Sequence, residues 1–98
     1  MSQQSKYVSD TLDFLNLLFD SDYQHLTDIK KITSIPPFER VIDIIDKHKS
    51  LCERLRIKKK DEISDTLILI NSLLKKSGFC LVKYGEKMQF YRIRILTN

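Results

Sequence analysis

A single glycine, Gly78, divides this chain into two parts that differ in the period of their apolar residues. Before it, apolar side chains recur with the spacing of one face of an α-helix. After it, residues 79–83 and 87–96 are rich in aromatic and β-branched residues, and Tyr84-Gly85-Glu86 lies between them as a turn. We therefore expect an α+β fold, mainly helical with three to four helices, that ends in a C-terminal β-hairpin.

The helical part contains clear start and stop signals. Pro36-Pro37 stands where a long helix can begin, because proline is tolerated in the first turn. Asp61 is expected to cap the last helix, and Gly78 is the favoured residue directly after a helix end. The helical stretches are expected at about residues 6–19, 23–32, 38–56 and 61–77.

The length of 98 residues limits the chain to one domain, which we expect to cover residues 1–98 with residues 1–5 as a tail. The first residues lack the basic and apolar regions of a signal peptide, and no apolar run is long enough to span a bilayer. Two cysteines are too few for a disulfide scaffold. These features predict an intracellular protein without a membrane role. The absence of alanine fits an AT-rich genome, such as that of a virus or plasmid.

The segment Leu73-Leu74-Lys75-Lys76-Ser77-Gly78-Phe79 combines an apolar helix end, a glycine and the start of a strand, and Phe90-Tyr91-Arg92-Ile93 closes the hairpin. This order resembles the end of many winged helix-turn-helix DNA-binding domains. Ile70-Asn71-Ser72-Leu73-Leu74 with the same hairpin is more weakly similar to the C-terminal winged-helix tail of viral and phage primase-helicases. The resemblance implies that the helix at 61–77 lies in the major groove and that the hairpin touches the adjacent backbone.

Charge is distributed unevenly along the chain. Residues 1–50 carry 6 basic and 8 acidic side chains, whereas residues 51–98 carry 11 basic and 5 acidic ones, a net charge of +6 within a total of +4. A basic region attracts nucleic acid through steering and counterion release. Asp61, Glu62 and Asp65 place negative charge at the end of the last helix that would approach phosphate. We therefore expect binding to the phosphate backbone through the basic turn and the hairpin more than base reading by this helix. The alternative to nucleic-acid binding is that the lysines and arginines of the strands only prevent aggregation through the sheet edges.

The candidate nucleic-acid-binding residues come from the basic turn, the outer side of the last helix and the hairpin. Arg92 and Arg94 alternate with Ile93 and Ile95, which predicts that both arginines point to the outer face. The candidates are Lys58, Lys59, Lys60, Ser64, Asn71, Lys75, Lys76, Lys83, Tyr84, Lys87, Arg92 and Arg94. Ile68 lies on the same side of the helix and is suited to contact a thymine methyl group.

The first helix has an apolar arc wider than half its circumference. Such a helix either runs through the centre of the domain or is covered by a partner, so a homodimer is one expectation. The candidate dimer or partner residues are Leu12, Leu15, Leu18 and Phe19.

Metal binding and catalysis have little support in the sequence. His48 and Cys52 have a spacing that suits two metal ligands, with His25 and Cys80 to complete a zinc site. They also suit the edge of the core, and we favour that interpretation, with no metal or cofactor. The two glycines build no phosphate-binding loop. We therefore expect no enzyme. We expect a module that binds double-stranded DNA, such as a dimeric transcription or replication accessory factor; a protein-interaction module is the alternative.

Overall fold

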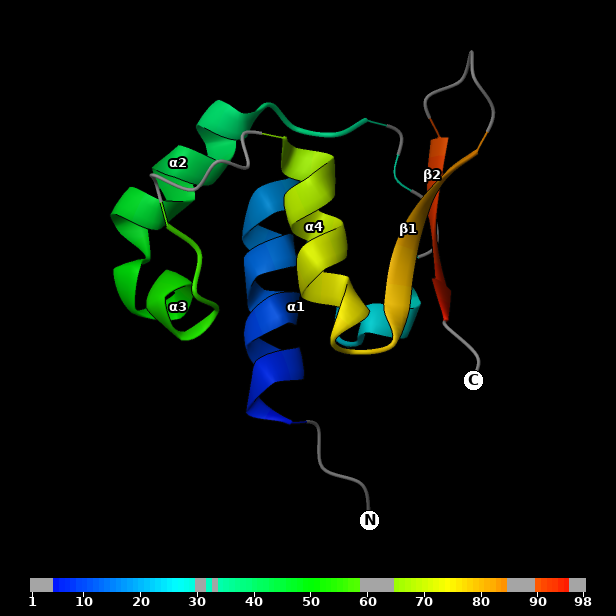
Figure 1. Ribbon diagram of the computed structural model, residues 1–98, viewed down its shortest axis with the longest axis horizontal. Coiled ribbons are helices and arrows are strands. Elements are labelled where there is room, and N and C mark those ends of the chain that lie inside the picture. Colours follow the sequence, from blue (N-terminus) through cyan, green and yellow to red (C-terminus); the bar gives the residue numbers. More distant parts are fainter. Residues whose placement is uncertain (1–4, 30–31, 33, 59–64, 85–89, 96–98) are drawn as a thin grey trace.

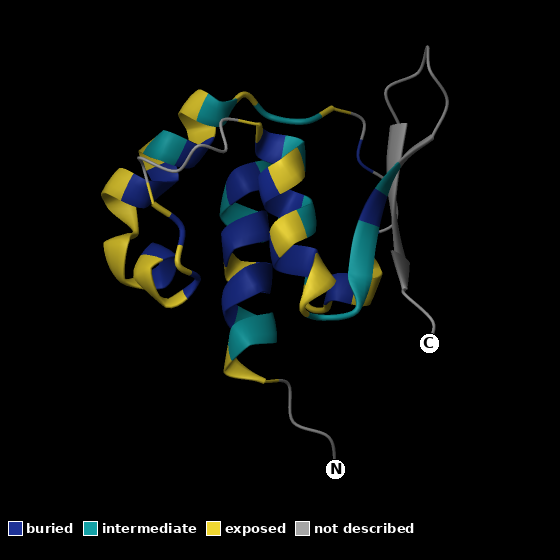
Figure 2. Ribbon diagram, in the orientation of Figure 1, coloured by how far each residue is buried: buried dark blue, intermediate teal, exposed yellow. Residues whose placement is uncertain are grey.

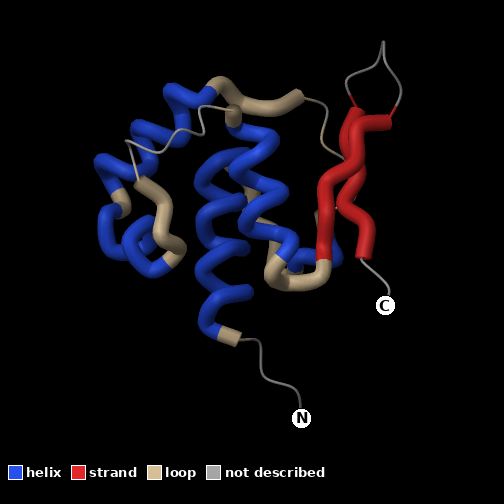
Figure 3. The backbone as a smooth tube through the Cα atoms, in the orientation of Figure 1, coloured by secondary structure: helices blue, strands red, loops and turns tan. Residues whose placement is uncertain are grey.

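The computed structural model describes residues 5–29, 32, 34–58, 65–84 and 90–95, and from Lys83 onward only the backbone is described. α1 and α4 lie side by side at the centre, with α2 and α3 on one side and the two strands on the other (Figures 1 and 3). The elements are α1 (Lys6–Phe19), the 3-10 helix η1 (Leu26–Asp28), α2 (Phe38–Lys47), α3 (Lys49–Arg54), α4 (Thr66–Lys75), β1 (Phe79–Tyr84) and β2 (Phe90–Ile95).

α1 covers the residues predicted for the first helix. The Ser5 hydroxyl accepts a hydrogen bond from the Val8 N–H at 3.1 Å and so caps the helix. Ser5 is therefore the N-cap of α1 rather than part of the expected tail. The helix ends at its C-cap Asp20, whose left-handed backbone (φ 52) lets the N–H of the following Ser21 bond the Asn16 carbonyl at 3.0 Å.

The segment after α1 is less helical than expected. Among the described residues of 23–32, the single 3-10 turn η1 is the only helical element, although Leu26, Ile29 and Ile32 are all buried. Their three-residue spacing matches the period of a 3-10 helix, which is stable only in short pieces. The Asn16 side chain holds this segment, because its amide donates to the Tyr23 carbonyl and accepts from the Tyr23 N–H, both at 2.9 Å.

The long helix expected at 38–56 is wrong, because the chain bends at His48 (φ −129, ψ 61) and forms α2 and α3 instead. Residues 46–50 are Asp-Lys-His-Lys-Ser, and all five are exposed. This stretch has no apolar side chain to bury, whereas Leu51 and Cys52 after it are buried. The bend turns those two side chains toward the core.

The strands pair in antiparallel orientation, with Leu81 opposite Ile93 and Val82 opposite Arg92. Gly78 has a left-handed backbone (φ 82), which lets the chain leave α4 and enter β1 without steric strain. Tyr84, which was expected in the turn, belongs to β1, and residues 85–89 lie outside the described part. A mainly helical α+β fold with β structure at the C-terminal end is confirmed.

The core lies where α1, α2, α3, α4 and β1 meet, and Figure 2 shows the buried positions along α1 and α4. Its fully buried side chains include Phe14, Leu15, Val41, Ile70 and Leu74. Within the described residues, none of the helices has both the length and the apolar character needed to cross a bilayer.

Candidate functional site

α4 is the element that the sequence singled out for contact with nucleic acid. It begins later than predicted, because Asp65 rather than Asp61 is the N-cap. The Asp65 carboxylate accepts hydrogen bonds from the Leu67 and Ile68 N–H groups, at 2.8 and 3.4 Å. Part of the negative charge expected at this helix end is therefore used to cap the helix. Asp61, Glu62 and Ser64 lie outside the described residues.

The outer side of α4 carries Ile68, Ser72 and Lys75, all of which are exposed. At 100° per residue these three positions fall within about 60° of arc, so they form one continuous strip along the helix. The opposite side is buried against α1 and β1. Exposed positions follow one side of α4 in Figure 2. We call Ile68, Ser72 and Lys75 the outer strip of α4.

Asn71 does not belong to this strip, although it was one of the predicted nucleic-acid-binding residues. Its Nδ2 donates to the Leu81 carbonyl at 3.3 Å, and its Oδ1 accepts from the Leu81 N–H at 2.6 Å. The N–H and C=O of one strand residue point to the same side, so this side of Leu81 faces α4 rather than β2. Asn71 thus joins α4 to β1, and its polar groups are not available to DNA.

The basic side chains near α4 differ in their surroundings. Lys75 and Lys76 at the end of α4 are exposed, and the Lys76 ammonium lies 5.4 Å from the centre of the Tyr7 ring. This geometry is a cation–π contact, which draws Lys76 toward α1. Lys58, after α3, is also exposed.

The remaining predicted binding residues are not described as side chains. Lys59, Lys60 and Lys87 lie outside the described part of the chain. Lys83, Tyr84, Arg92 and Arg94 are described by their backbone alone, with Arg92 opposite Val82 and Arg94 opposite Cys80.

The candidate partner surface on α1 lies inside the molecule. Leu12, Leu15 and Leu18 are at most 7% exposed, and Phe19 is half-buried against the core. The wide apolar arc of α1 is explained by its central position, where α2, α3 and α4 all contact it. These leucines are therefore covered within one chain and offer no surface to a second one.

Asp10 is a charged residue in this buried part of α1, and the sequence did not single it out. Arg54 on α3 donates to both of its carboxylate oxygens, from Nε at 2.9 Å and from Nη2 at 3.2 Å. These hydrogen bonds lower the pKa of Asp10 and raise that of Arg54. The pair joins α1 to α3. The two residues are far apart in sequence, so no local pattern indicates their contact.

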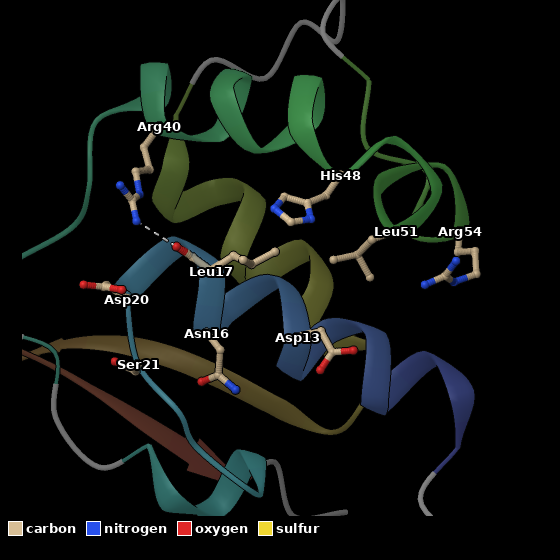
Figure 4. Close-up of a pocket in the computed structure, with 9 residues that line it drawn as sticks. All are labelled: Asp13, Asn16, Leu17, Asp20, Ser21, Arg40, His48, Leu51 and Arg54. Atoms are coloured by element: carbon tan, nitrogen blue, oxygen red, sulfur yellow. Dashed lines mark hydrogen bonds between the residues drawn. The ribbon is translucent and has the colours of Figure 1, made fainter.

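A hollow of about 510 Å³ lies beside α1, below the bend between α2 and α3 (Figure 4). The Arg40 guanidinium in its wall donates to the Leu17 carbonyl at 3.0 Å, and Arg54 is paired with Asp10. Asp13 and Asp20 balance the charge of the two arginines in the lining, so the hollow has no excess positive charge with which to attract an anion. It is lined by Asp13, Asn16, Leu17, Asp20, Ser21, Arg40, His48, Leu51 and Arg54.

The four residues considered for zinc have different environments. Cys52 is buried and desolvation raises the pKa of its thiol, so it behaves as a small apolar side chain. His48 is exposed at the bend and does not lie at the core edge as expected. His25 caps η1 through its backbone N–H, which bonds Asp28. Cys80 is half-buried on β1, opposite Arg94 of β2. Among the described residues, no group of three or more His, Cys, Asp or Glu side chains is arranged to hold a metal ion.

Comparisons with protein-family models, with curated proteins and with solved structures give no match to this chain.

Proposed function

We propose that this protein is a non-enzymatic nucleic-acid-binding module of the winged-helix type, which binds double-stranded DNA through the outer strip of α4. The observation that carries the proposal is the chemistry of this strip. Ile68, Ser72 and Lys75 present an apolar group, a hydroxyl and an ammonium group on one exposed side. These groups suit thymine methyls, base edges and phosphates, respectively.

The order of the elements supports a winged-helix arrangement. α1 is followed by a single-residue β-bridge at Ile32, then by α2, α3 and α4, and finally by the pair β1 and β2. α4 packs directly against β1, and Asn71 links the two. A helix held this way against a strand pair can enter the major groove while the strands lie along the neighbouring backbone.

The charge of the C-terminal half supports the same proposal. Residues 51–98 carry a net charge of +6. Lys75 is exposed on the strip, and its end of α4 is the negative end of the helix dipole. The dipole alone explains a lysine at this position, so the decisive property is whether Lys75 contributes to binding. A role in transcription or replication for a virus or plasmid fits such a module.

The alternative, a protein-interaction module, depended on the apolar side of residues 6–19 and on the acidic N-terminal half of the chain. In the structure the apolar side of α1 is covered by α2, α3 and α4 of the same chain. The burial of Leu15 and Leu18 therefore gives no support to this alternative or to a homodimer through α1.

The test is a titration of labelled duplex and single-stranded oligonucleotides, followed by fluorescence anisotropy at low and at physiological salt. We expect duplex binding that weakens as salt rises. Lys75→Glu should weaken duplex binding by about tenfold at about 0.1 M salt. One phosphate contact contributes nearly one unit to the slope of log affinity against log salt concentration, so it is worth about tenfold at that concentration. Lys49→Glu is the matched control, since Lys49 is an exposed lysine on α3, away from the strip.

Two results would overturn the proposal. One is the absence of duplex binding at low salt by a chain whose circular dichroism shows it to be folded. The other is an equal loss of affinity in Lys75→Glu and Lys49→Glu, which would mean that only net charge matters and that α4 is not the interface.

A further inference from the structure

Ile68 is the one large apolar side chain that is exposed among the described residues, with 55% of its surface accessible. A β-branched residue is also a weaker helix former than lysine or glutamate, which usually occupy the outer side of a surface helix. Neither helix propensity nor packing therefore explains isoleucine at this position. Single exposed apolar residues are common on protein surfaces, so its neighbourhood has to decide what it does.

Among the described residues, the neighbours of Ile68 along the outer side of α4 are polar. Ser72 and Lys75 continue the outer strip on one side, and the Asp65 cap lies on the other. A protein partner would need a contiguous apolar patch many times larger than one side chain. A duplex offers a closer match, because its major groove is polar except for the C5-methyl groups of thymine. One apolar side chain beside a hydroxyl and an ammonium group complements that surface.

We infer that Ile68 is a specificity-determining residue that packs against the C5-methyl group of thymine in the major groove. This inference rests on the proposed function. It assigns the outer strip a preference for thymine-containing sites, with Ile68 responsible for the preference and Lys75 for affinity that is independent of sequence. The loss of one buried methyl contact corresponds to about a fourfold loss of affinity.

The test compares two duplexes, each about two helical turns long, of alternating dA-dT and alternating dA-dU. They differ only in the thymine methyl groups. We expect the unaltered protein to bind the dA-dT duplex at least about fourfold more tightly than the dA-dU duplex. Ile68→Ala should lose most of the preference shown by the unaltered protein, whereas Ile68→Val, which keeps a branched apolar side chain, should retain most of it.

Ser72→Ala is the matched control, because it alters the same strip without removing the apolar contact. Its dA-dT to dA-dU ratio should equal that of the unaltered protein. Methyl removal also changes the shape of the duplex, but that change is common to all variants and cancels when their ratios are compared. Ile68→Ala should fold normally, since the side chain is exposed and alanine is the better helix former.

Equal binding of the two duplexes by the unaltered protein would overturn the inference, as would an unchanged ratio in Ile68→Ala. In both cases the proposed function would stand, because duplex binding itself would be observed. Absence of binding to either duplex would instead overturn the proposed function, and the inference with it.

Discussion

Asn71 provides the sharpest test of how this fold holds its candidate DNA-binding helix. Its side-chain amide accepts from the Leu81 N–H at 2.6 Å and donates to the Leu81 carbonyl at 3.3 Å. We expect Asn71→Ala to separate α4 from β1 at this point, because alanine offers neither group. The variant should lose stability rather than base recognition.

The magnitude follows from these two hydrogen bonds. Leu81 is only 5% exposed, so water does not readily replace the lost partner of its N–H. An unsatisfied buried donor costs about 1–3 kcal/mol, and the longer hydrogen bond to the carbonyl adds about 0.5 kcal/mol. We expect Asn71→Ala to lower the free energy of unfolding by about 2–3 kcal/mol. For a domain of this size, that corresponds to a fall in Tm of about 10–20 °C.

The assay is urea denaturation followed by circular dichroism, with the anisotropy titration carried out at a temperature where the variant is folded. Ser72→Ala, the exposed neighbour on the same helix, should change the free energy of unfolding by less than about 0.5 kcal/mol. Asn71→Asp keeps an acceptor for the Leu81 N–H but opposes the carbonyl, so its loss should be at least as large as that of alanine.

A free energy of unfolding within about 0.5 kcal/mol of the unaltered protein would refute the reasoning. So would a stable Asn71→Ala variant with weakened DNA binding, because Asn71 would then be a base-contacting residue. The first result would mean that Asn71 does not hold α4 to β1. The second would mean that Asn71 binds nucleic acid, as the sequence predicted.

Two further predictions concern other parts of the fold. Hydrogen bonds from Arg54 lower the pKa of Asp10 below its usual 3.8, so this pair stabilises the folded state above that pH and the stabilisation is lost as acid protonates Asp10. The urea midpoint should therefore fall on acidification below about pH 4, and Asp10→Asn should show a smaller acid-dependent fall; identical pH profiles would contradict this. Gly78→Ala should cost about 1 kcal/mol through its left-handed backbone alone, since an added Cβ would meet no atom within 4 Å. Gly78→Asn, measured in the same thermal melts, should cost less, and an equal cost for both would point to a steric clash instead.

Much of the fold follows from patterns that are local in sequence. The extent of α1 follows from its apolar spacing; Ser5, which caps it within the same turn, is also a local signal, although it was assigned to the tail. Gly78 separates the helical period from the strand period because its left-handed backbone belongs to the exit from a helix. These features need no knowledge of distant residues, and for that reason they were predictable.

The helix boundaries at 38–56 and 61–77 were predicted less well, because each depended on a choice between several local signals. Asp61 and Asp65 are both good N-cap residues, and the structure shows that Asp65 caps α4 through the Leu67 and Ile68 N–H groups. The polar run at 46–50 is compatible with a solvated helix. The bend at His48 forms because it allows Leu51 and Cys52 to reach the core.

The candidate site shows the same division. The amino-acid sequence determined that residues 51–98 are basic, that α4 has an apolar and a polar side, and that Ile68, Ser72 and Lys75 share the polar side. Tertiary structure alone decided that Asn71 is bonded to Leu81 and that α1 is covered by its own chain. Hydrophobic periodicity identifies which side of a helix avoids water, but the surface that covers it, and the partner of each polar side chain, come from residues far away along the chain.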